Sequence, residues 1–309
     1  MSAAELRRKY MKPLAGMDKH SRLGAWAIFS TYVLLILASV LLGAVLLTLP
    51  VSAWTVAAMA FLALFIGTRL RGLNNIVHEC SHSTFSAHKS DNVIIGSLCA
   101  SLTLGCFKDY RDEHLTHHMH TGDYERDHDL MAIQALRLEE PLTPRVVLRH
   151  FVTPLIGRHL PYYLRVSLSG RDGIEYQMLK LLILVTAAAF TYVQPMAGLL
   201  FVVAPFVLVY STINYWTDCL DHAGLVGSSD DLESARNVLA PGLVRFLFFP
   251  RNDCYHLVHH LFPHVPARHL AESHVKLLSD EDYRTRPNAA RPDTRPPQKA
   301  PALRPSRAT

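Results

Sequence analysis

Apolar residues are gathered in long uncharged runs that divide the chain into membrane-length segments. Residues 24–49, 51–68 and 181–217 contain no charged side chain, and Gln194-Pro195 interrupts the last run. A helix needs about 20 apolar residues to cross a bilayer, so the pattern predicts four transmembrane helices. They cover about residues 25–48, 52–70, 176–193 and 196–216.

The segments between these runs predict the remaining elements. No proline interrupts residues 54–85, so the second helix is expected to continue past the membrane. Residues 93–107 are uncharged but too short to span, which favours a re-entrant or interfacial segment. Residues 131–175 alternate apolar runs with arginines and tyrosines. That pattern is typical of helices in the lipid headgroup layer, with an ordinary soluble connector as the alternative.

The distribution of charge predicts how the helices are oriented. Residues 1–24 carry six Lys and Arg against Glu5 and Asp18, whereas the connections at 50–53 and 194–196 are uncharged. Basic flanks stay in the cytoplasm, so residues 1–24 are predicted to be a cytoplasmic N-terminal segment. With four spans, the C-terminus and the segment between the second and third helices face the same compartment.

Composition fits a membrane protein and argues against a nucleic-acid partner. Half of the 309 residues are apolar and 18% are charged, as expected for a small multi-span protein. The net charge of +5 comes from residues 284–309, which hold seven basic residues, Asp293 and six prolines. We predict a disordered basic tail near the membrane surface. Five cysteines without CxxC spacing are expected to be reduced and packed.

Three histidine motifs lie in segments expected on the cytoplasmic side: HECSH at 78–82, HLTHH at 114–118 and HLVHH at 256–260. Helical positions i, i+3 and i+4 share a face, so each triple is predicted to point its imidazoles at a single place. Chance explains one HxxxH pair among 18 histidines, but not the same triple twice. The motifs therefore predict metal ligands. These are His78, His82, His114, His117, His118, His256, His259 and His260.

His222 emerges after the fourth predicted helix on the same side and is expected to join these ligands. Asp218 and Asp221 precede it by four residues and by one. Acidic residues also flank the second motif and are candidates to orient imidazole N–H groups, with a solvated acidic segment as the alternative. They are Asp109, Asp112, Glu113, Asp123, Asp127 and Asp129. The other nine histidines are expected at the surface or behind the ligands.

Nine imidazoles exceed what one tetrahedral zinc needs and suit two transition-metal ions with open positions. Iron is favoured over zinc, because two redox-active ions can accept electrons and use O2 to attack an unactivated C–H bond. No side chain is then needed as an acid, base or nucleophile. A histidine-based metal transporter or sensor is a competing class, but transport needs ionisable residues along the spans, and the long apolar runs have none.

The chain resembles the membrane fatty acid desaturase and hydroxylase family over roughly residues 25–275. The marks are HECSH at 78–82, HLTHH at 114–118 followed by HTGDYERDHDL, and HLVHHLFPHVP at 256–266, in the family's order of spans and motifs. The resemblance implies an all-α integral membrane protein with four transmembrane helices and a cytoplasmic helical cap that holds a histidine-ligated di-iron site. His222 matches the additional histidine that the family carries after its last span.

The chain departs from the family pattern at two places, one just before His222 and one after the second motif. Some members carry an asparagine four residues before the additional histidine, and others carry an acidic residue directly before it. Here Asp218 and Asp221 stand at these positions, and both are candidates to support the metal ligands. Where the family often has Asp-Pro-Asp after the second motif, this chain has Asp127-His128-Asp129, a difference that bears on the substrate.

The resemblance implies an oxidoreductase, specifically an O2-dependent acyl-lipid desaturase, with lipid or carotenoid hydroxylation or ketolation as the alternative. Such a reaction consumes O2 and two electrons per turnover by the family's stoichiometry. The chain shows no GxGxxG phosphate loop and no cysteine cluster for iron–sulfur. A separate ferredoxin-, rubredoxin- or b-type-cytochrome-like donor, with its reductase, is therefore expected to dock on the cap.

Overall fold

The computed structural model describes residues 2–164, 166–228 and 230–289. Within these ranges the protein is all-helical, as predicted, and the only β-type pairing is an isolated bridge between His20 and Ser86. The α-helices are α1 (Ala3–Leu14), α2 (Arg22–Leu46), α3 (Ala53–Ser81), α4 (Lys89–Leu102), α5 (Phe107–His120), α6 (His128–Met131), α7 (Pro144–Leu155), α8 (Leu160–Tyr163), α9 (Ile174–Val193), α10 (Pro195–Gly198), α11 (Ser211–His222), α12 (Gly242–Phe248), α13 (His256–Leu261), α14 (Leu270–Leu277) and α15 (Glu281–Arg284).

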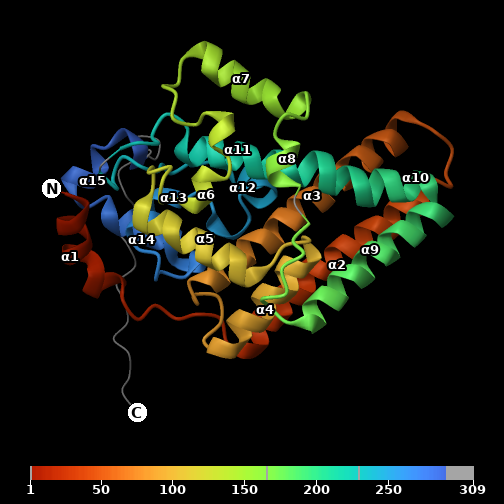
Figure 1. Ribbon diagram of the computed structural model, residues 1–309, viewed down its shortest axis with the longest axis horizontal. Coiled ribbons are helices and arrows are strands. Elements are labelled where there is room, and N and C mark those ends of the chain that lie inside the picture. The colour runs from red at the N-terminus through yellow and green to blue at the C-terminus, as the bar shows by residue number, and fades with distance from the viewer. Residues whose placement is uncertain (1, 165, 229, 290–309) are drawn as a thin grey trace.

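Four helices are long and apolar enough to cross a membrane, which confirms the predicted number. They are α2, α3, α9 and the continuous helix Pro195–His222. The last helix contains α10, two π-helical segments and α11. The chain turns from α9 into α10 at Gln194, where the sequence places the break. Figure 1 shows these helices as one elongated bundle, and their large apolar side chains mostly face outward, as lipid-facing surfaces do.

Small residues allow the spans to approach one another closely. A Cβ atom at Gly67 of α3 would overlap Val209 in the last span, and one at Gly72 would overlap the Tyr32 ring of α2. Small residues at such crossings are typical of packed transmembrane helices. The contact between Gly72 and Tyr32 also places these two residues at the same level of the bundle.

Helix α3 carries the chain out of the bundle and into the region of the histidine motifs. It has 29 residues, which corresponds to about 44 Å at 1.5 Å per residue. A hydrocarbon core is only about 30 Å thick. The first histidine motif, at the end of α3, therefore lies beyond the membrane-length part of the helix, as the uninterrupted sequence predicts.

The uncharged segment at residues 93–107 forms a helix and a sharp turn. Helix α4 ends at Leu102, Leu104 has a left-handed φ of 62°, and α5 begins at Phe107. The axes of α4 and α5 differ by 102°. Helix α4 packs against α3 and α9, and the turn aims α5 with its three histidines at the end of α3.

The helices outside the bundle form what we call the cap, which comprises α1, α5–α8 and α12–α15. Leu6 and Leu14 of α1 belong to the same buried cluster as Leu257 and Leu261 of α13. The N-terminal helix therefore lies on the same side of the bundle as the third motif (Figure 1). The first residues of the predicted disordered tail are ordered, because Arg284 ends α15 and Pro287–Ala289 form a 3-10 helix that buries Ala289. Residues 290–309 of that tail lie outside the described residues.

Helices α7 and α8 occupy the segment predicted to lie in the headgroup layer. Helix α7 buries His150 and Thr153 but turns Leu148, Phe151 and Leu155 outward. Its exposed apolar face gives it the expected amphipathic character. Its position at the membrane surface stays a prediction.

Candidate metal centre

Nine imidazoles meet where the cap joins the bundle, and they form two neighbouring clusters. The first cluster comprises His78, His82, His114, His118 and His259, and the second comprises His117, His222, His256 and His260. Within each cluster the facing ring nitrogens all lie within 4.8 Å of one another. These are the nine histidines that the sequence predicts, and the described part of the chain contains no third group of this kind.

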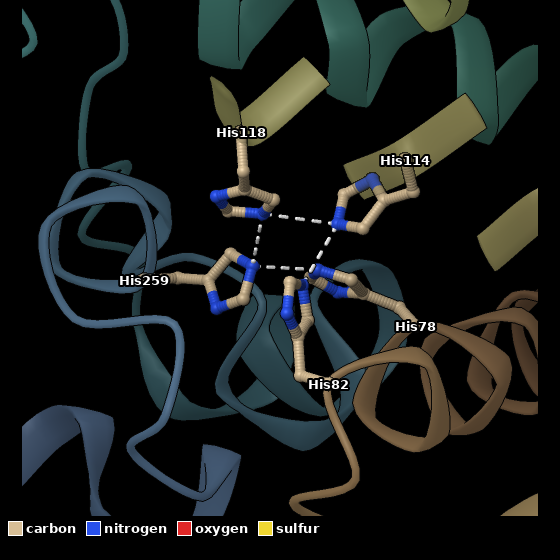
Figure 2. Close-up of side chains that lie close together, drawn as sticks. All are labelled: His78, His82, His114, His118 and His259. Carbon is tan, nitrogen blue, oxygen red and sulfur yellow. Dashed lines mark hydrogen bonds between the residues drawn. The ribbon is translucent and has the colours of Figure 1, made fainter. Parts of the chain in front are cut away.

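In the first cluster the Nε2 atoms converge from three helices. The Nε2 atom of His259 lies 2.7 Å from that of His78 and 3.0 Å from that of His118. The Nε2 atom of His114 lies 3.0 Å from those of His82 and His118. Figure 2 shows the five rings from α3, α5 and α13 pointing at a common centre.

The second cluster is built in the same way from α5, α11 and α13. The Nε2 atom of His256 lies 2.9 Å from that of His222 and 3.0 Å from that of His260. The Nε2 atoms of His117 and His260 are 3.2 Å apart. All four side chains are buried, so this centre is shielded from bulk water.

The two histidine triples do not each converge on a single point, and that prediction is wrong. On each helix the i, i+4 pair enters one cluster and the i+3 residue enters the other. The pairs are His114 with His118 and His256 with His260, and the crossing residues are His117 and His259. Successive helical residues are rotated by about 100°, so positions i+3 and i+4 point in clearly different directions. Each helix therefore serves both clusters and holds them side by side.

In two of the rings, a hydrogen bond on the side away from the cluster fixes the proton on Nδ1. The unprotonated nitrogen, Nε2, then faces the cluster. The Nδ1 atom of His222 lies 2.9 Å from the carbonyl oxygen of Ser234, and a carbonyl only accepts, so Nδ1–H donates. The Nδ1 atom of His117 similarly lies 2.8 Å from the Asp127 carboxylate. The Nε2 atoms of both rings therefore keep their lone pairs and point inward. Lone pairs gathered this closely repel one another, and a bound cation removes that repulsion.

The spacing of the rings fits metal ligation. At a metal–nitrogen distance of about 2.1 Å, ligands at right angles lie about 3.0 Å apart, and tetrahedral ligands about 3.4 Å apart. The inward contacts of 2.7 to 3.2 Å match the right-angle arrangement. The two clusters are therefore compatible with metal sites.

The protonation state of the rings also fits metal ligation. Burial lowers the pKa of His256, His259 and His260 well below the usual value. Burial and the charge of Arg111 lower the pKa of His82 to about 3. These rings are neutral at pH 7, which is the form that binds metal ions.

Two carboxylates that follow the second motif contact imidazoles. Asp127 is fully buried beside His117, where burial lowers the pKa of the imidazole but the hydrogen bond and charge of Asp127 raise it overall. Asp127 thus makes His117 a stronger electron donor. Asp129 lies 3.4 Å from the Nδ1 atom of His114, but its side chain is 45% exposed. Asp127 is therefore the stronger partner of the two.

The two acidic residues near His222 have different surroundings. A carboxylate oxygen of Asp221 lies 3.6 Å from the Nδ1 atom of His256, beside the second cluster. Asp218 instead accepts a hydrogen bond of 2.6 Å from the Tyr163 hydroxyl. Of the two candidates, Asp221 is the one placed against a ring of the histidine clusters.

Other acidic residues around the second motif form ion pairs away from the clusters. Asp109 and Asp112 both contact Arg171, and Asp123 contacts Arg126. All three pairs are partly exposed. For these residues the solvated acidic segment is the better description.

Two buried ion pairs stabilise the site, and the sequence pattern does not show which residues form them. Arg71 of α3 donates to Asp253 at 2.6 Å and to Asn214 at 2.8 Å. Arg251 pairs with Glu79, which follows His78 directly. Both pairs join α3 to the segment that leads into α13, so they set the third motif against the first. A signal exists in the sequence, because charged residues on an otherwise apolar helix require partners.

Residues outside the clusters include the cysteines and three buried histidines. All five cysteines are free, and none belongs to either histidine cluster. His150, His159 and His274 are buried away from the clusters, contrary to the expected surface or supporting positions. Each ring is close to a hydroxyl group, and the hydroxyls belong to Tyr215, Ser211 and Tyr283, respectively. They are core histidines with local polar partners.

Comparison with known proteins assigns this arrangement to a family. The sequence model of the family described as fatty acid desaturase matches residues 52–287. The chain belongs to the fatty acid desaturase family. The matched region runs from the start of α3 to beyond α15 and includes all nine clustered histidines. The resemblance seen in the three motifs is thereby confirmed.

Individual desaturases are similar to this family member at low identity. It is 26% identical to the dihydrorhizobitoxine desaturase of Bradyrhizobium elkanii, over 91% of this chain and 82% of that protein. It is 26% identical to the chloroplastic sn-2 acyl-lipid omega-3 desaturase (ferredoxin) of Arabidopsis thaliana, over 71% of this chain and 54% of that protein. It is 23% identical to the endoplasmic reticulum acyl-lipid omega-3 desaturase (cytochrome b5) of the same plant, over 71% of this chain and 61% of that protein. The chain thus spans little more than half the length of these plant relatives.

The comparisons and the geometry agree on the general nature of this desaturase. It is an oxidoreductase of a membrane-type family, its structure contains four membrane-length helices, and its histidine clusters are compatible with a metal site.

Proposed function

We propose that the protein is an O2-dependent acyl-lipid desaturase in which the nine clustered histidines hold two iron ions. The observation that carries this proposal is the pair of imidazole clusters, one partly buried and one buried. Neighbouring Nε2 atoms in them lie 2.7 to 3.2 Å apart, which is the spacing of cis metal ligands. The first cluster offers five ligands and the second offers four. A six-coordinate ion would keep at least one open position in each.

The two irons would supply the oxidising power, with O2 and two electrons, to remove hydrogen from an unactivated C–H bond. The protein's own residues hold the rings and keep water away. Ser234 and Asp127 lock the rings of His222 and His117 through their Nδ1 atoms. Because burial keeps the second cluster, and His114 and His259 of the first, apart from bulk water, the reaction would be directed at a substrate C–H bond.

An acyl-lipid substrate is supported by the family and by the names of the plant relatives. We assign residues 25–275 to the membrane desaturase domain and residues 1–24 to the N-terminal segment. Hydroxylation or ketolation of a lipid or carotenoid is the rival on the same site. After the first hydrogen is removed, substrate geometry decides between removal of a second hydrogen and transfer of oxygen.

A non-lipid substrate is a second candidate, and one comparison favours it. The desaturase of Bradyrhizobium elkanii, whose name specifies dihydrorhizobitoxine, matches 91% of this chain and most of its own length. The plant acyl-lipid enzymes match a smaller share of both chains. A substrate assay therefore includes polar small molecules beside acyl lipids.

Electron supply from a separate protein is part of the proposal. The names of two plant relatives specify ferredoxin and cytochrome b5, and donors of these classes are small proteins that dock on a partner. We assign the docking face to the cap and place the cap, both termini and the metal centre in the cytoplasm. The basic flank of the first span supports this orientation.

Reconstitution of the purified protein tests the reaction. The mixture contains acyl lipids and polar small molecules as substrates, a ferredoxin or b-type cytochrome with its reductase, and O2, and products are identified by mass spectrometry. An unsaturated lipid supports the proposal, whereas a hydroxylated lipid favours the rival and an unsaturated polar molecule favours the second candidate. Equal product without O2 or without a donor contradicts all three.

A ligand variant tests the metal centre. The double variant His117→Ala/His118→Ala removes one ligand from each cluster, so iron content should fall and turnover should be lost. His120→Ala is the matched control, because His120 lies on the same helix but outside both clusters. Full activity in wild-type protein with less than one iron per chain contradicts the di-iron assignment.

A further inference from the structure

A cavity lies where the bundle meets the cap, and arginines are prominent in its walls. It measures about 490 Å³ and is lined by residues of α2, α3, α12 and the short segments that follow α12. The residues that matter here are Arg69, Arg245, Arg251 and Arg268, with Tyr32 and Phe246 among the aromatic walls. We call this cavity the arginine cleft.

Only part of the positive charge in the arginine cleft is balanced. Arg251 pairs with Glu79, and Arg268 lies 3.4 Å from Asp18, whose side chain is 78% exposed. His20 also lines the cleft, and burial, followed by the charges of Arg251 and Arg268, lowers its pKa to about 4. Protonating another group here is therefore unfavourable, as expected beside excess positive charge.

Arg69 and Arg245 contact no carboxylate among the described residues. Arg69 is only 2% exposed, and its guanidinium donates to the backbone oxygen of Phe246 and stacks on that ring at 4.5 Å. Arg245 donates to the side-chain oxygen of Asn252 at 2.7 Å. Neutral partners satisfy some N–H groups but not the charge, and burying an unpaired cation is costly. An anion in the cleft would offset that cost.

The level of the cleft indicates where the anion comes from. Arg69 lies sixteen residues past Ala53, the first residue of α3, which is about 24 Å along the helix at 1.5 Å per residue. A hydrocarbon core is about 30 Å thick, so Arg69 stands near its cap-side boundary. Helix α12 exposes Phe246 at the same cleft, and Leu243 of this helix is also exposed. Arginine beside exposed apolar side chains is the pattern of a lipid headgroup layer.

The wall of the cleft is held in an unusual backbone conformation. Arg251 and Asn252 both have positive φ values, 65° and 61°, which are uncommon for residues other than glycine. The Glu79 ion pair and a hydrogen bond of 2.9 Å from Asn252 to the carbonyl oxygen of Ala267 hold this turn in place. The cleft is therefore a built feature of the fold.

We infer that the arginine cleft binds the phosphate of a membrane phospholipid. Arginine meets phosphate oxygens with paired, charge-assisted hydrogen bonds, and Tyr32 and Phe246 provide apolar surface for the glycerol and the first methylenes. The volume lies within the range of small-ligand sites. Arg251 also lines the small cavity that borders His78, His256 and His259. A bound phospholipid would thus lie next to the metal centre.

Binding is measured without turnover, so this inference can fail or hold independently of the proposed function. The purified full chain in detergent is titrated with palmitoyl-oleoyl-phosphatidylglycerol, and native mass spectrometry measures how much lipid is bound. Parallel titrations use palmitoyl-oleoyl-glycerol, which lacks the phosphate, sodium oleate, and inorganic phosphate. The phospholipid is expected to bind at least tenfold more tightly than each of the other three. If the diacylglycerol binds as tightly as the phospholipid, the cleft does not recognise the phosphate and the inference is wrong. If oleate binds as tightly, the cleft is a carboxylate site and the inference is wrong. If inorganic phosphate binds as tightly, the cleft does not recognise the lipid part and the inference is wrong.

Variants locate the site. Arg245→Gln and Arg69→Gln each remove one unbalanced charge and should weaken phosphatidylglycerol binding about tenfold, the effect of losing one charge-assisted contact. Arg8→Gln is the matched control, because Arg8 is an exposed arginine of α1 outside the cleft. If Arg69→Gln does not fold, the binding measured for Arg245→Gln decides, because Arg245 is only half-buried. Unchanged binding in Arg245→Gln, or an equal loss in Arg8→Gln, contradicts the assignment.

Discussion

Asp127 offers a precise test of how the protein positions a metal ligand. One carboxylate oxygen accepts the Nδ1–H of His117 at 2.8 Å, and the other accepts the backbone N–H of Leu130 at 3.0 Å. Asp127→Asn keeps the shape but replaces one oxygen with an N–H donor. Either the NH2 group then faces the donor N–H of His117, or it faces the N–H of Leu130. One of the two hydrogen bonds must be lost.

The expected magnitude can be worked out from these contacts. A hydrogen bond to a charged group contributes about 1.5–3 kcal/mol, and loss of an outer partner of a metal-bound histidine typically weakens the metal by about 10- to 100-fold. Asp127 contacts His117 of the second cluster and none of the five histidines of the first. The variant should therefore release one iron early while the other iron remains.

Chelator titration measures this effect. Purified protein loaded with iron is titrated with a chelator, and the iron per chain is read by mass spectrometry. Wild type should release its two ions over a similar range, whereas Asp127→Asn should release the first at a roughly 10- to 100-fold lower chelator concentration. Asp129→Asn is the control, because that side chain is 45% exposed and lies 3.4 Å from His114.

Two results would refute the reasoning. If both ions leave Asp127→Asn together, the two clusters do not act as separate sites. If Asp129→Asn weakens iron as much as Asp127→Asn, then burial and hydrogen-bond length do not control ligand orientation here. A simple loss of folding is detected separately by size-exclusion chromatography of the metal-free variant.

Three further predictions test the fold. Reporter tags at the N-terminus, near Asp123 and at the C-terminus should all be reached from the cytoplasm, because the four spans bring these points to one side. Asp253→Asn should destabilise the protein by about 3 kcal/mol, since it leaves Arg71 buried without its charge partner, and thermal aggregation assays in detergent measure the loss. Gly67→Ala should cost about 1–3 kcal/mol in the same assay, because the new Cβ overlaps Val209.

Matched controls accompany these variants. Arg126→Gln breaks an exposed ion pair and should change stability by less than about 1 kcal/mol. Gly242→Ala adds a Cβ with no atom within 4 Å and should be nearly neutral. A tag near Asp123 that is reached only from outside contradicts the topology. If Arg126→Gln lowers stability as much as Asp253→Asn, the argument from the buried ion pair is wrong. If Gly242→Ala lowers stability as much as Gly67→Ala, the argument from helix packing is wrong.

The amino-acid sequence by itself determined the membrane architecture of this protein. Uncharged runs of bilayer length have one stable arrangement in lipid, because a helix satisfies its own backbone hydrogen bonds. The break at Gln194 followed from Pro195 and the length of the run. The gathering of nine histidines was equally predictable, since local spacing puts residues on a shared helical face and the span count puts the three motifs and His222 on one side.

Only the tertiary structure decided how these histidines divide into two clusters. Spacing along a helix gives the relative rotation of His117 and His118, but not where α13 lies, and α13 contributes histidines to both clusters. The same limit applies to Asp127, whose role depends on the turn between α5 and α6. Local periodicity defines faces on single helices, whereas a site needs the relative positions and rotations of several.

Long-range charge pairing was likewise settled only by packing. Arg71 meets Asp253 across 182 residues of sequence, and Arg69 meets the backbone of Phe246 across 177. Any arginine on α3 needs a partner, but many carboxylates in the chain qualify until the helices are placed. The choice depends on which groups become neighbours once the apolar surfaces of the bundle and cap are buried, because burial excludes water and leaves each charge only the partners within reach.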